Sequence, residues 1–298
     1  MEEKLRGVFA PITTPFTAEG EVNYEGLAKN VRAYARAGLK GFLALGSNGE
    51  NKSLTNEEKL KVLDTIASNK TKEQVVMAGC IFESTFETID MARKMEQSRP
   101  DYLTLLPPSY FKKQMTDDVL YKYFTDVADA VKTPCLVYNA PQYAGGVGLS
   151  VGLIKRVASH SNILGIKDSS AGNMESILFA VRDKFTVVSG SVNNFFQCMT
   201  MGGAGGVLSF ADAFPAECLK LYNLLDSKRY DEAIPYYDFL LRVSKVIGGK
   251  GGVAAVKYAM DLNGFVGGDP RLPLMPLEQC EQEAIEQTLS AEGMLTKK

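Results

Sequence analysis

The hydrophobic residues of this chain form short runs that alternate with longer stretches of helical period. Eight of these runs are rich in β-branched and aliphatic residues, which predicts strands. Most of them are nearly continuous in apolar residues, as is typical of parallel strands that are buried on both faces. The predicted strands cover residues 7–13, 41–45, 75–79, 102–106, 134–138, 163–167, 186–189 and 206–209.

The segments between these strands are long enough for helices, and two helix starts carry caps. Thr55 and Glu58 form a capping box before an apolar stretch, and Thr116 precedes two acidic residues at the start of another. Eight strands that alternate with helices indicate an α/β protein of the closed (β/α)8, or TIM, barrel type. We expect this barrel to occupy residues 1–225, and a C-terminal helical extension packed on it to occupy residues 226–298.

Composition narrows the classes of partner. The chain has 298 residues and a net charge of -2, and its Lys and Arg residues are scattered among Asp and Glu. It therefore offers no basic field for nucleic acid or anionic lipid. No apolar stretch approaches the roughly 18 to 20 residues that span a bilayer. The first residues, Met1-Glu2-Glu3-Lys4, lack the pattern of a signal peptide. We expect a cytoplasmic protein without nucleic-acid or membrane partners.

Cysteine and histidine counts narrow the chemistry. The five cysteines are an odd number, are widely spaced and form no CxxC pair, which suggests neither a disulfide framework nor a zinc site. His160 is the single histidine, so a metal site of several histidines is excluded and a His-based triad has one candidate base. We expect no metal.

The barrel hypothesis sorts the candidate residues, because strand C-termini and the loops that follow them form the active face of a (β/α)8 barrel. Lys167 ends the sixth predicted strand, Tyr138 ends the fifth, and residues 46–50 follow the second. All of these belong to the active face. His160 precedes the sixth strand and falls on the opposite, structural face.

Lys167 is the most informative of these residues. An amine at the end of an apolar strand is partly desolvated, which lowers its pKa and frees its lone pair for attack on a carbonyl. This predicts a Schiff-base enzyme, although lysines also end strands simply to reach water. Tyr138, on the neighbouring strand, is placed to move protons beside Lys167, or alternatively is an aromatic residue of the barrel rim.

Residues 46–50, Gly-Ser-Asn-Gly-Glu, predict a carboxylate site. The Ser47 hydroxyl and the amides of Asn48 and Gly49 are donors that a glycine turn holds in place, although Asn48-Gly49 is also simply a good turn. We expect Glu50 to cap or brace this loop, with contact to substrate as the alternative.

Two further loops hold candidates. Tyr110 follows the fourth strand in a loop stiffened by prolines, where it serves either a subunit contact or the chemistry. Gly190 follows the seventh strand and is placed for close approach of a ligand. The glycine run 202–206 leads into a strand instead of a helix, so we interpret it as a tight turn, not a phosphate loop.

These motifs resemble those of the dihydrodipicolinate synthase / N-acetylneuraminate lyase family of class I, pyruvate-dependent aldolases. The resemblance covers nearly the whole chain. It is carried by GVFAPITTPF at 7–16, GSNGE at 46–50, residues 107–111, Tyr138-Asn139-Ala140-Pro141, GIKDS at 165–169, GVLS at 206–209 and Pro270-Arg271-Leu272-Pro273. Several such motifs in order are specific, whereas each alone is not.

The resemblance implies a role for each candidate residue. Lys167 is then the Schiff-base lysine that carries the covalent pyruvate, Tyr138 the proton relay, and Ser47 the hydroxyl that links Tyr138 to bulk solvent or to a partner tyrosine. Tyr110 resembles the tyrosine that reaches into the adjacent subunit's site. The family is usually a dimer of dimers, and needs no metal or organic cofactor.

The resemblance also implies the substrate contacts. The amides of Ser47 and Asn48 then bind the pyruvate carboxylate, and the Leu208 backbone lies near the pyruvyl group. Two departures bear on the second substrate. Dihydrodipicolinate synthases typically carry an arginine where this chain has Tyr143, and a phenol lacks the charge and the forked donors of a guanidinium. GSNGE also replaces the GTTGE that is usual in those synthases.

We therefore favour a lyase that cleaves or forms a 4-hydroxy-2-oxo acid, of the 4-hydroxy-2-oxoglutarate or 2-keto-3-deoxy-sugar-acid type. The first alternative is a dihydrodipicolinate synthase that condenses pyruvate with aspartate semialdehyde without the arginine. The second is a non-catalytic barrel that binds a keto acid. The third is a phosphate-binding barrel isomerase. No general-base carboxylate stands out at the end of a predicted strand, which argues against this alternative.

Overall fold

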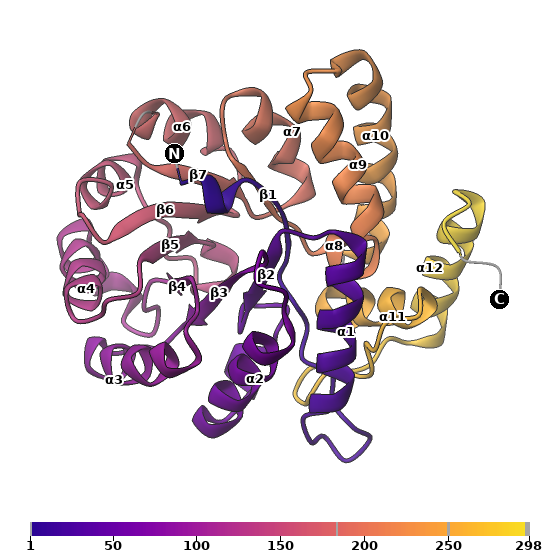
Figure 1. Cartoon of the computed structure of the whole chain (residues 1–298), viewed down its shortest axis with the longest axis horizontal. Coiled ribbons are helices and arrows are strands. Elements are labelled where there is room, and N and C mark those ends of the chain that lie inside the picture. Colours follow the sequence, from indigo (N-terminus) through magenta and orange to yellow (C-terminus); the bar gives the residue numbers. More distant parts are fainter. Residues whose placement is uncertain (1, 183, 249–250, 296–298) are drawn as a thin grey trace. The chain divides into compact units, whose positions relative to one another are not determined.

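The computed structural model describes residues 2–182, 184–248 and 251–295 of the chain. Its strands follow one another in the order β1 to β8 and close into a barrel, with helices between them and after the last strand (Figure 1). The predicted (β/α)8 barrel with a C-terminal helical extension is therefore confirmed.

The strands are β1 Gly7–Ala10, β2 Gly41–Ala44, β3 Val75–Cys80, β4 Tyr102–Leu105, β5 Cys135–Asn139, β6 Ile163–Asp168, β7 Thr186–Ser189 and β8 Gly205–Val207. The helices are α1 Tyr24–Ala37, α2 Asn56–Asn69, α3 Thr85–Met95, α4 Asp117–Asp129, α5 Val151–Val157, α6 Met174–Val181, α7 Val192–Thr200, α8 Phe210–Ala213, α9 Pro215–Asp226, α10 Tyr230–Ile247, α11 Gly252–Leu262 and α12 Gln279–Ala291.

The observed strands differ from the predicted runs mainly at their ends. The first strand stops at Ala10 instead of residue 13, while the fifth and sixth continue one residue further, to Asn139 and Asp168. Tyr138 and Lys167 are therefore the last residues but one of their strands. Apolar pattern alone does not predict that a polar residue such as Asp168 still pairs within the sheet.

One compact unit of the chain combines Met1–Gly7 with Val75–Val207. Its neighbouring strands pair in parallel, from β3 with β4 through β7 with β8. Figure 1 shows α3 to α6 on the outer side of these strands. Every residue of β3, β4, β5 and β7 is buried, because the strands pack on both faces.

The second compact unit combines Val8–Gln74 with Leu208–Lys298. The chain after α11 is fastened to α1 here, since the Asn30 side chain donates to the carbonyl oxygen of Val266 at 2.7 Å and accepts from its amide at 2.8 Å. The Tyr34 ring stacks on Phe265 with centroids 4.8 Å apart, and its hydroxyl donates to the Asp212 carbonyl oxygen at 2.6 Å. The predicted boundary between residues 225 and 226 does not coincide with the limits of these two units. The division into a barrel and a C-terminal extension at that point stays a prediction.

Both predicted helix caps are confirmed. Thr55 Oγ1 accepts from the Glu58 amide at 3.2 Å while the Thr55 amide donates to the Glu58 carboxylate at 2.8 Å, so the capping box is complete. The Thr116 side chain accepts from the Val119 amide at the start of α4. Within the described ranges, no helix is long and apolar enough to cross a membrane.

Gly165 gives the fold a direct test. A Cβ at this position would lie 2.5 Å from the Thr186 carbonyl oxygen on β7, so we expect Gly165→Ala to lower the free energy of unfolding by about 1 to 3 kcal/mol. The midpoint of urea unfolding, followed by circular dichroism, measures this change.

The matched control is Gly152→Ala. That position lies on the exposed side of α5, and an added Cβ would meet only ordinary contact, 3.6 Å from Ser150 Oγ. The same substitution should there raise stability by about 0.5 to 1 kcal/mol. Equal effects of the two substitutions would contradict the tight β6–β7 contact.

Candidate active site

Lys167 and Tyr138 lie side by side in the first unit. The parallel register of β5 and β6 pairs Tyr138 with Lys167 and Asn139 with Asp168. Lys167 Nζ lies over the Tyr138 ring, 4.2 Å from its centroid. Tyr138 is 1% exposed and Lys167 is 4% exposed. Since successive residues of a strand point to opposite faces, this pair shares one face of the sheet and Asn139 and Asp168 share the other.

Asp168 braces the ends of these two strands. Its Oδ1 accepts from Asn139 Nδ2 at 2.7 Å and from Ser170 Oγ at 2.8 Å, and Asn139 Oδ1 in turn accepts from the Leu149 amide at 3.0 Å. Oδ2 is buried and has no hydrogen-bond partner among the described residues. Burial raises the pKa of Asp168, and hydrogen bonds from Ser170 and Asn139 act against this rise.

Sequence reasoning missed this brace. Asn139 and Asp168 stand directly after Tyr138 and Lys167, within motifs that assign neither of them a role. A polar residue immediately after an active-face residue, on each of two neighbouring strands, is the signal that predicts such a pair.

Tyr110 is the most exposed of the predicted site residues. It is 81% exposed, and its ring meets that of Phe111 edge-on, with centroids 5.0 Å apart. The amides of Ser109 and Tyr110 donate to the Glu83 carboxylate at 2.8 and 2.9 Å, which holds the loop in place.

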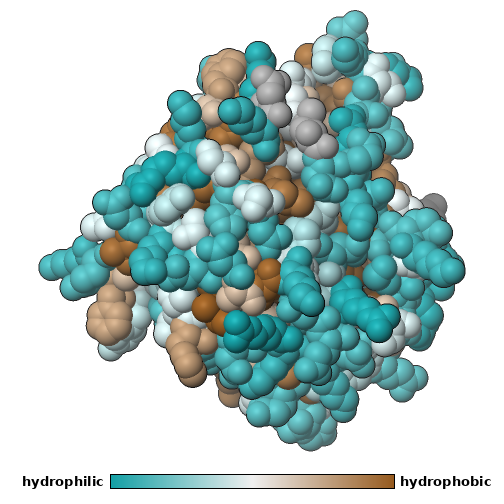
Figure 2. Space-filling model, turned by 60° about the vertical axis from the view of Figure 1, so that its left-hand side comes forward, coloured by the Kyte–Doolittle hydropathy of each residue, from teal (hydrophilic) through white to brown (hydrophobic). Residues whose placement is uncertain are grey.

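The face of the molecule in Figure 2 is mostly hydrophilic, with hydrophobic side chains in small groups.

Tyr143 lies near Tyr138 in the same unit. Partial burial, and then the neighbouring Tyr138, raise the pKa of the Tyr143 phenol. Tyr143 as a whole is nevertheless 53% exposed. Tyr143 is therefore close enough to Tyr138 for the two phenols to interact electrostatically.

Gly190 follows β7 and has a packing reason for being glycine. An added Cβ would lie 1.8 Å from Ser169 Oγ, and the Gly190 amide donates to the Asp168 carbonyl oxygen at 2.7 Å. The glycine thus lets the ends of β6 and β7 meet closely. Its predicted contact with a ligand stays a prediction.

The predicted carboxylate loop, Ser47 to Glu50, lies in the second unit directly after β2. Thr14 Oγ1 donates to the Gly49 carbonyl oxygen at 2.8 Å, and Asn48 Nδ2 donates to the buried Asp212 carboxylate at 3.0 Å. The Asn48 side chain is therefore used in holding the loop. Leu208 follows β8, and its amide donates to the Phe9 carbonyl oxygen at 3.0 Å.

The predicted site residues thus fall into two groups. Lys167, Tyr138, Tyr110 and Gly190 belong to the first unit, whereas Ser47, Asn48, Gly49 and Leu208 belong to the second. Within the first unit the structure brings Lys167 and Tyr138 together. Within the second, residues 47–49 share one turn.

Histidine and cysteine lie apart from these groups. His160 precedes β6, as predicted, and its Nε2 lies 3.1 Å from Asp129 Oδ1. Burial raises the pKa of the Cys135 and Cys198 thiols to about 12, which leaves them unreactive. Across residues 2–182, 184–248 and 251–295, no group of three or more His, Cys, Asp or Glu residues is arranged to hold a metal ion.

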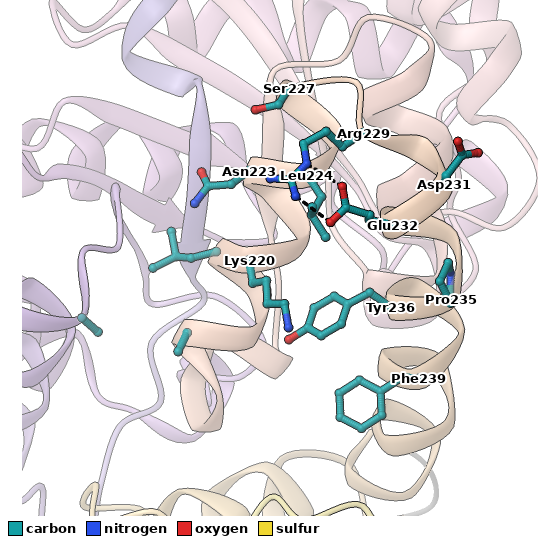
Figure 3. Close-up of a pocket in the computed structure, with 13 residues that line it drawn as sticks. Lys220, Asn223, Leu224, Ser227, Arg229, Asp231, Glu232, Pro235, Tyr236 and Phe239 are labelled. Carbon is teal, nitrogen blue, oxygen red and sulfur yellow. Dashed lines mark hydrogen bonds and ion pairs between the residues drawn. The ribbon is translucent and has the colours of Figure 1, made fainter.

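A separate hollow of about 980 Å³ lies between α9 and α10 in the second unit (Figure 3). Three of the charged side chains that line it, those of Lys220, Arg229 and Glu232, contact other lining residues. Arg229 donates to both carboxylate oxygens of Glu232, at 2.7 and 2.5 Å, and Lys220 Nζ lies 4.1 Å from the centroid of the Tyr236 ring. The predicted site residues are not among those that line the hollow, and we assign no chemistry to it.

Comparison with known proteins relates these features to a family. The family model described as "Dihydrodipicolinate synthetase family" matches residues 4–292. A 4-hydroxy-tetrahydrodipicolinate synthase of Gluconacetobacter diazotrophicus is 29% identical over 98% of this chain and 98% of its own. A protein named "Probable 4-hydroxy-2-oxoglutarate aldolase, mitochondrial" of Emericella nidulans is 30% identical over 95% of this chain and 94% of its own.

A solved structure is similar over the same extent. YagE, described as a prophage protein of E. coli K12 in complex with pyruvate and as belonging to the dihydrodipicolinic acid synthase family, matches with a TM-score of 0.90 and 26% identity. The match covers 97% of this chain and 99% of that chain.

The raised pKa of Asp168 predicts a pH effect on stability. The folded protein holds the Asp168 proton more tightly than the unfolded chain does, so its contribution is complete below the ordinary pKa of 3.8. That contribution is lost as the pH rises through the raised pKa. Compared with Asp168→Asn, the wild type should therefore lose free energy of unfolding as the pH rises above this value.

Urea unfolding of both proteins from about pH 4 to pH 8 measures this difference. The other titrating groups are the same in both proteins, so their contributions to the pH dependence cancel in the difference. If the wild type instead gained stability relative to the variant as the pH rises, the pKa of Asp168 would be lowered in the folded protein. That result would contradict a carboxyl whose pKa is raised by burial.

Proposed function

This chain belongs to the dihydrodipicolinate synthetase family of pyruvate-dependent lyases and aldolases, and on that premise we propose that it is a Schiff-base lyase. It cleaves or forms a 4-hydroxy-2-oxo acid through a pyruvate enamine on Lys167. The observation that carries the proposal is the buried amine of Lys167, 4.2 Å from the centroid of the Tyr138 ring. Burial disfavours the ammonium form of a lysine, and the neutral amine is the nucleophile that a carbonyl requires.

In the proposed reaction Lys167 Nζ attacks the keto carbon of pyruvate to give a carbinolamine. Loss of water then gives the Schiff base, and loss of a methyl proton gives the enamine. The enamine carbon attacks an aldehyde carbonyl, which forms the new carbon–carbon bond and leaves the 4-hydroxyl. Hydrolysis of the Schiff base releases the 4-hydroxy-2-oxo acid and returns the amine, and cleavage runs through the same steps in reverse.

Tyr138 moves the protons of these steps. Its ring contacts Lys167 Nζ, so its phenol is placed to give a proton to the carbinolamine hydroxyl as it leaves as water, and to give one to the aldehyde oxygen as the new carbon–carbon bond forms. In the cleavage direction its phenolate takes the proton back from the 4-hydroxyl. Ser47 relays protons between Tyr138 and bulk solvent or a tyrosine of a partner subunit. Tyr110 is that tyrosine in a homotetramer built as a dimer of dimers, where its exposed ring makes a subunit contact.

The keto-acid carboxylate is bound in this proposal by the Ser47 hydroxyl and the amides of Asn48 and Gly49, with the Leu208 backbone near the pyruvyl group. Support comes from the loop itself, which Thr14 and Asp212 hold by hydrogen bonds before any substrate arrives. No metal or organic cofactor takes part, and the protein works in the cytoplasm.

Tyr143 supports the choice of second substrate. It stands close to Tyr138, where a guanidinium would grip the carboxylate of aspartate semialdehyde with two donors, and a phenol offers one. This favours a 4-hydroxy-2-oxoglutarate or 2-keto-3-deoxy-sugar-acid type of substrate. The second candidate, dihydrodipicolinate synthase activity, is supported by the synthase of Gluconacetobacter diazotrophicus among the relatives. A barrel that binds a keto acid without catalysis needs no buried amine.

Trapping with borohydride tests the Schiff base. Incubation with pyruvate and borohydride should leave a reduced pyruvyl adduct on Lys167, detected by peptide mass spectrometry. Lys167→Arg should form no adduct and should lose lyase activity by at least about a thousandfold. Lys122→Arg, at an exposed lysine of α4, is the matched control. This variant should keep the adduct on Lys167 and the lyase activity. Folded wild-type protein without an adduct would overturn the proposal in favour of a non-catalytic barrel.

A second experiment tests the substrate class. The value of kcat/KM for cleavage of 4-hydroxy-2-oxo acids should exceed that for condensation of pyruvate with aspartate semialdehyde. Tyr143→Arg should shift the ratio towards aspartate semialdehyde by roughly tenfold or more, because it restores the forked donors. Wild-type protein that prefers aspartate semialdehyde would identify the synthase instead.

A further inference from the structure

An ion pair without any exposure to solvent lies beneath the predicted carboxylate loop. Lys257 Nζ, on α11, donates to Glu50 Oε1 at 2.7 Å, and both side chains are 0% exposed. Glu50 ends the turn that begins at Ser47, and Lys257 follows it by 207 positions in the sequence. The pair therefore joins the loop after β2 to the C-terminal helices of the same unit.

Both charges are held by further bonds. Glu50 Oε2 accepts from the Arg271 amide at 2.9 Å. Lys257 Nζ also donates to the Asp269 carbonyl oxygen at 2.9 Å and lies 4.5 Å from the centroid of the Phe16 ring. Burial lowers the pKa of Lys257, and the Glu50 carboxylate opposes this change. Taking two charges out of water is costly, so such a pair is better suited to fixing one arrangement than to adding stability.

The backbone of the loop needs such a restraint. Glu50 has a φ of 52°, in the left-handed region that residues with a side chain rarely adopt. Its amide donates to the Ser47 carbonyl oxygen at 3.1 Å, and its own carbonyl oxygen accepts from the Ser53 amide at 2.8 Å. The direction of the Glu50 side chain thus sets the turn that carries the Ser47 and Asn48 amides.

Arg271 extends the restraint to the start of α2. Its guanidinium binds both carboxylate oxygens of Glu58 at 2.7 Å, and donates to the Ser53 carbonyl oxygen at 2.8 Å. The backbone of residues 269–271 therefore contacts Lys257 and Glu50, while the Arg271 side chain reaches Ser53 and Glu58. The stretch from the turn to the helix is held along its length by one segment of the C-terminal region.

We propose that Glu50 and Lys257 are positioning residues of the keto-acid site. Together with Arg271 they hold the turn at Ser47 and Asn48 in the geometry that binds the substrate carboxylate. This inference rests on the proposed function for the identity of the ligand. It gives α11 and the segment that follows it a role in substrate binding that acts through the loop.

Two variants test the proposal, Lys257→Met and the double variant Glu50→Gln/Lys257→Met. Lys257→Met leaves a buried carboxylate without its cation, so it should lose stability as well as loop order. The double variant removes both charges and should fold with nearly wild-type stability, yet it lacks the bond that ties the loop to α11. The pyruvate concentration that gives half-maximal borohydride trapping should rise by roughly 10- to 100-fold in both variants. The maximal rate of trapping should change less than about threefold, because Lys167 is untouched.

Hydrogen–deuterium exchange supplies a readout that needs no substrate. Peptides that cover residues 46–53 should exchange faster in the double variant than in the wild type. Leu240→Ala is the control, since Leu240 is fully buried in α10 and its loss lowers stability without touching the loop. Its exchange over residues 46–53 and its half-saturation for pyruvate should remain as in the wild type.

The outcomes separate this inference from the proposed function. A double variant with wild-type half-saturation and wild-type exchange would overturn the positioning role while leaving the Schiff base intact. If wild-type protein forms no pyruvyl adduct, the proposed function fails, and exchange alone then decides: faster exchange confined to residues 46–53 upholds the restraint on the loop, and unchanged exchange overturns it.

Discussion

The parallel register of β5 and β6 is the constraint on which the rest of the candidate site depends. It places Tyr138 beside Lys167 on one face of the sheet and Asn139 beside Asp168 on the other. The first pair has the groups that amine chemistry needs, and the second pair joins the ends of the same strands by a hydrogen bond of 2.7 Å. A shift of one residue would exchange the faces and would bring the carboxyl of Asp168 to the place of the amine.

Buried polar groups hold the predicted site residues within each unit. In the first unit, Asp168 binds Asn139 and Ser170, at a cost in desolvation that its raised pKa records. In the second, the Glu50–Lys257 pair and the Asn48–Asp212 hydrogen bond hold the loop after β2. Removing one partner of such a group leaves the other buried and unsatisfied, which makes each arrangement rigid and sensitive to substitution. This restraint suits the proposed reaction, which would depend on the placement of a small keto acid.

Local pattern was sufficient to predict the barrel, its helix caps and the positions of Lys167 and Tyr138 within one residue of the ends of their strands. Each of these depends on residues close together in the sequence, such as the apolar run that ends at Lys167 or the Thr55 and Glu58 spacing. The sequence also led us to expect that Glu50 braces its loop, but the partner that holds it was not predictable in this way. Lys257 lies on a helix far along the chain from Glu50, and nothing in its own neighbourhood marks it as the partner of a carboxylate.

In the reaction that we propose, Lys167 forms a covalent bond with the keto carbon of pyruvate. A crystal structure of the protein soaked with pyruvate tests it most directly. We expect continuous electron density from Lys167 Nζ to the second carbon of pyruvate, with the carboxylate within hydrogen-bond distance of the Ser47 and Asn48 amides. Pyruvate bound without a bond to Lys167, or attached to a different lysine, would contradict it.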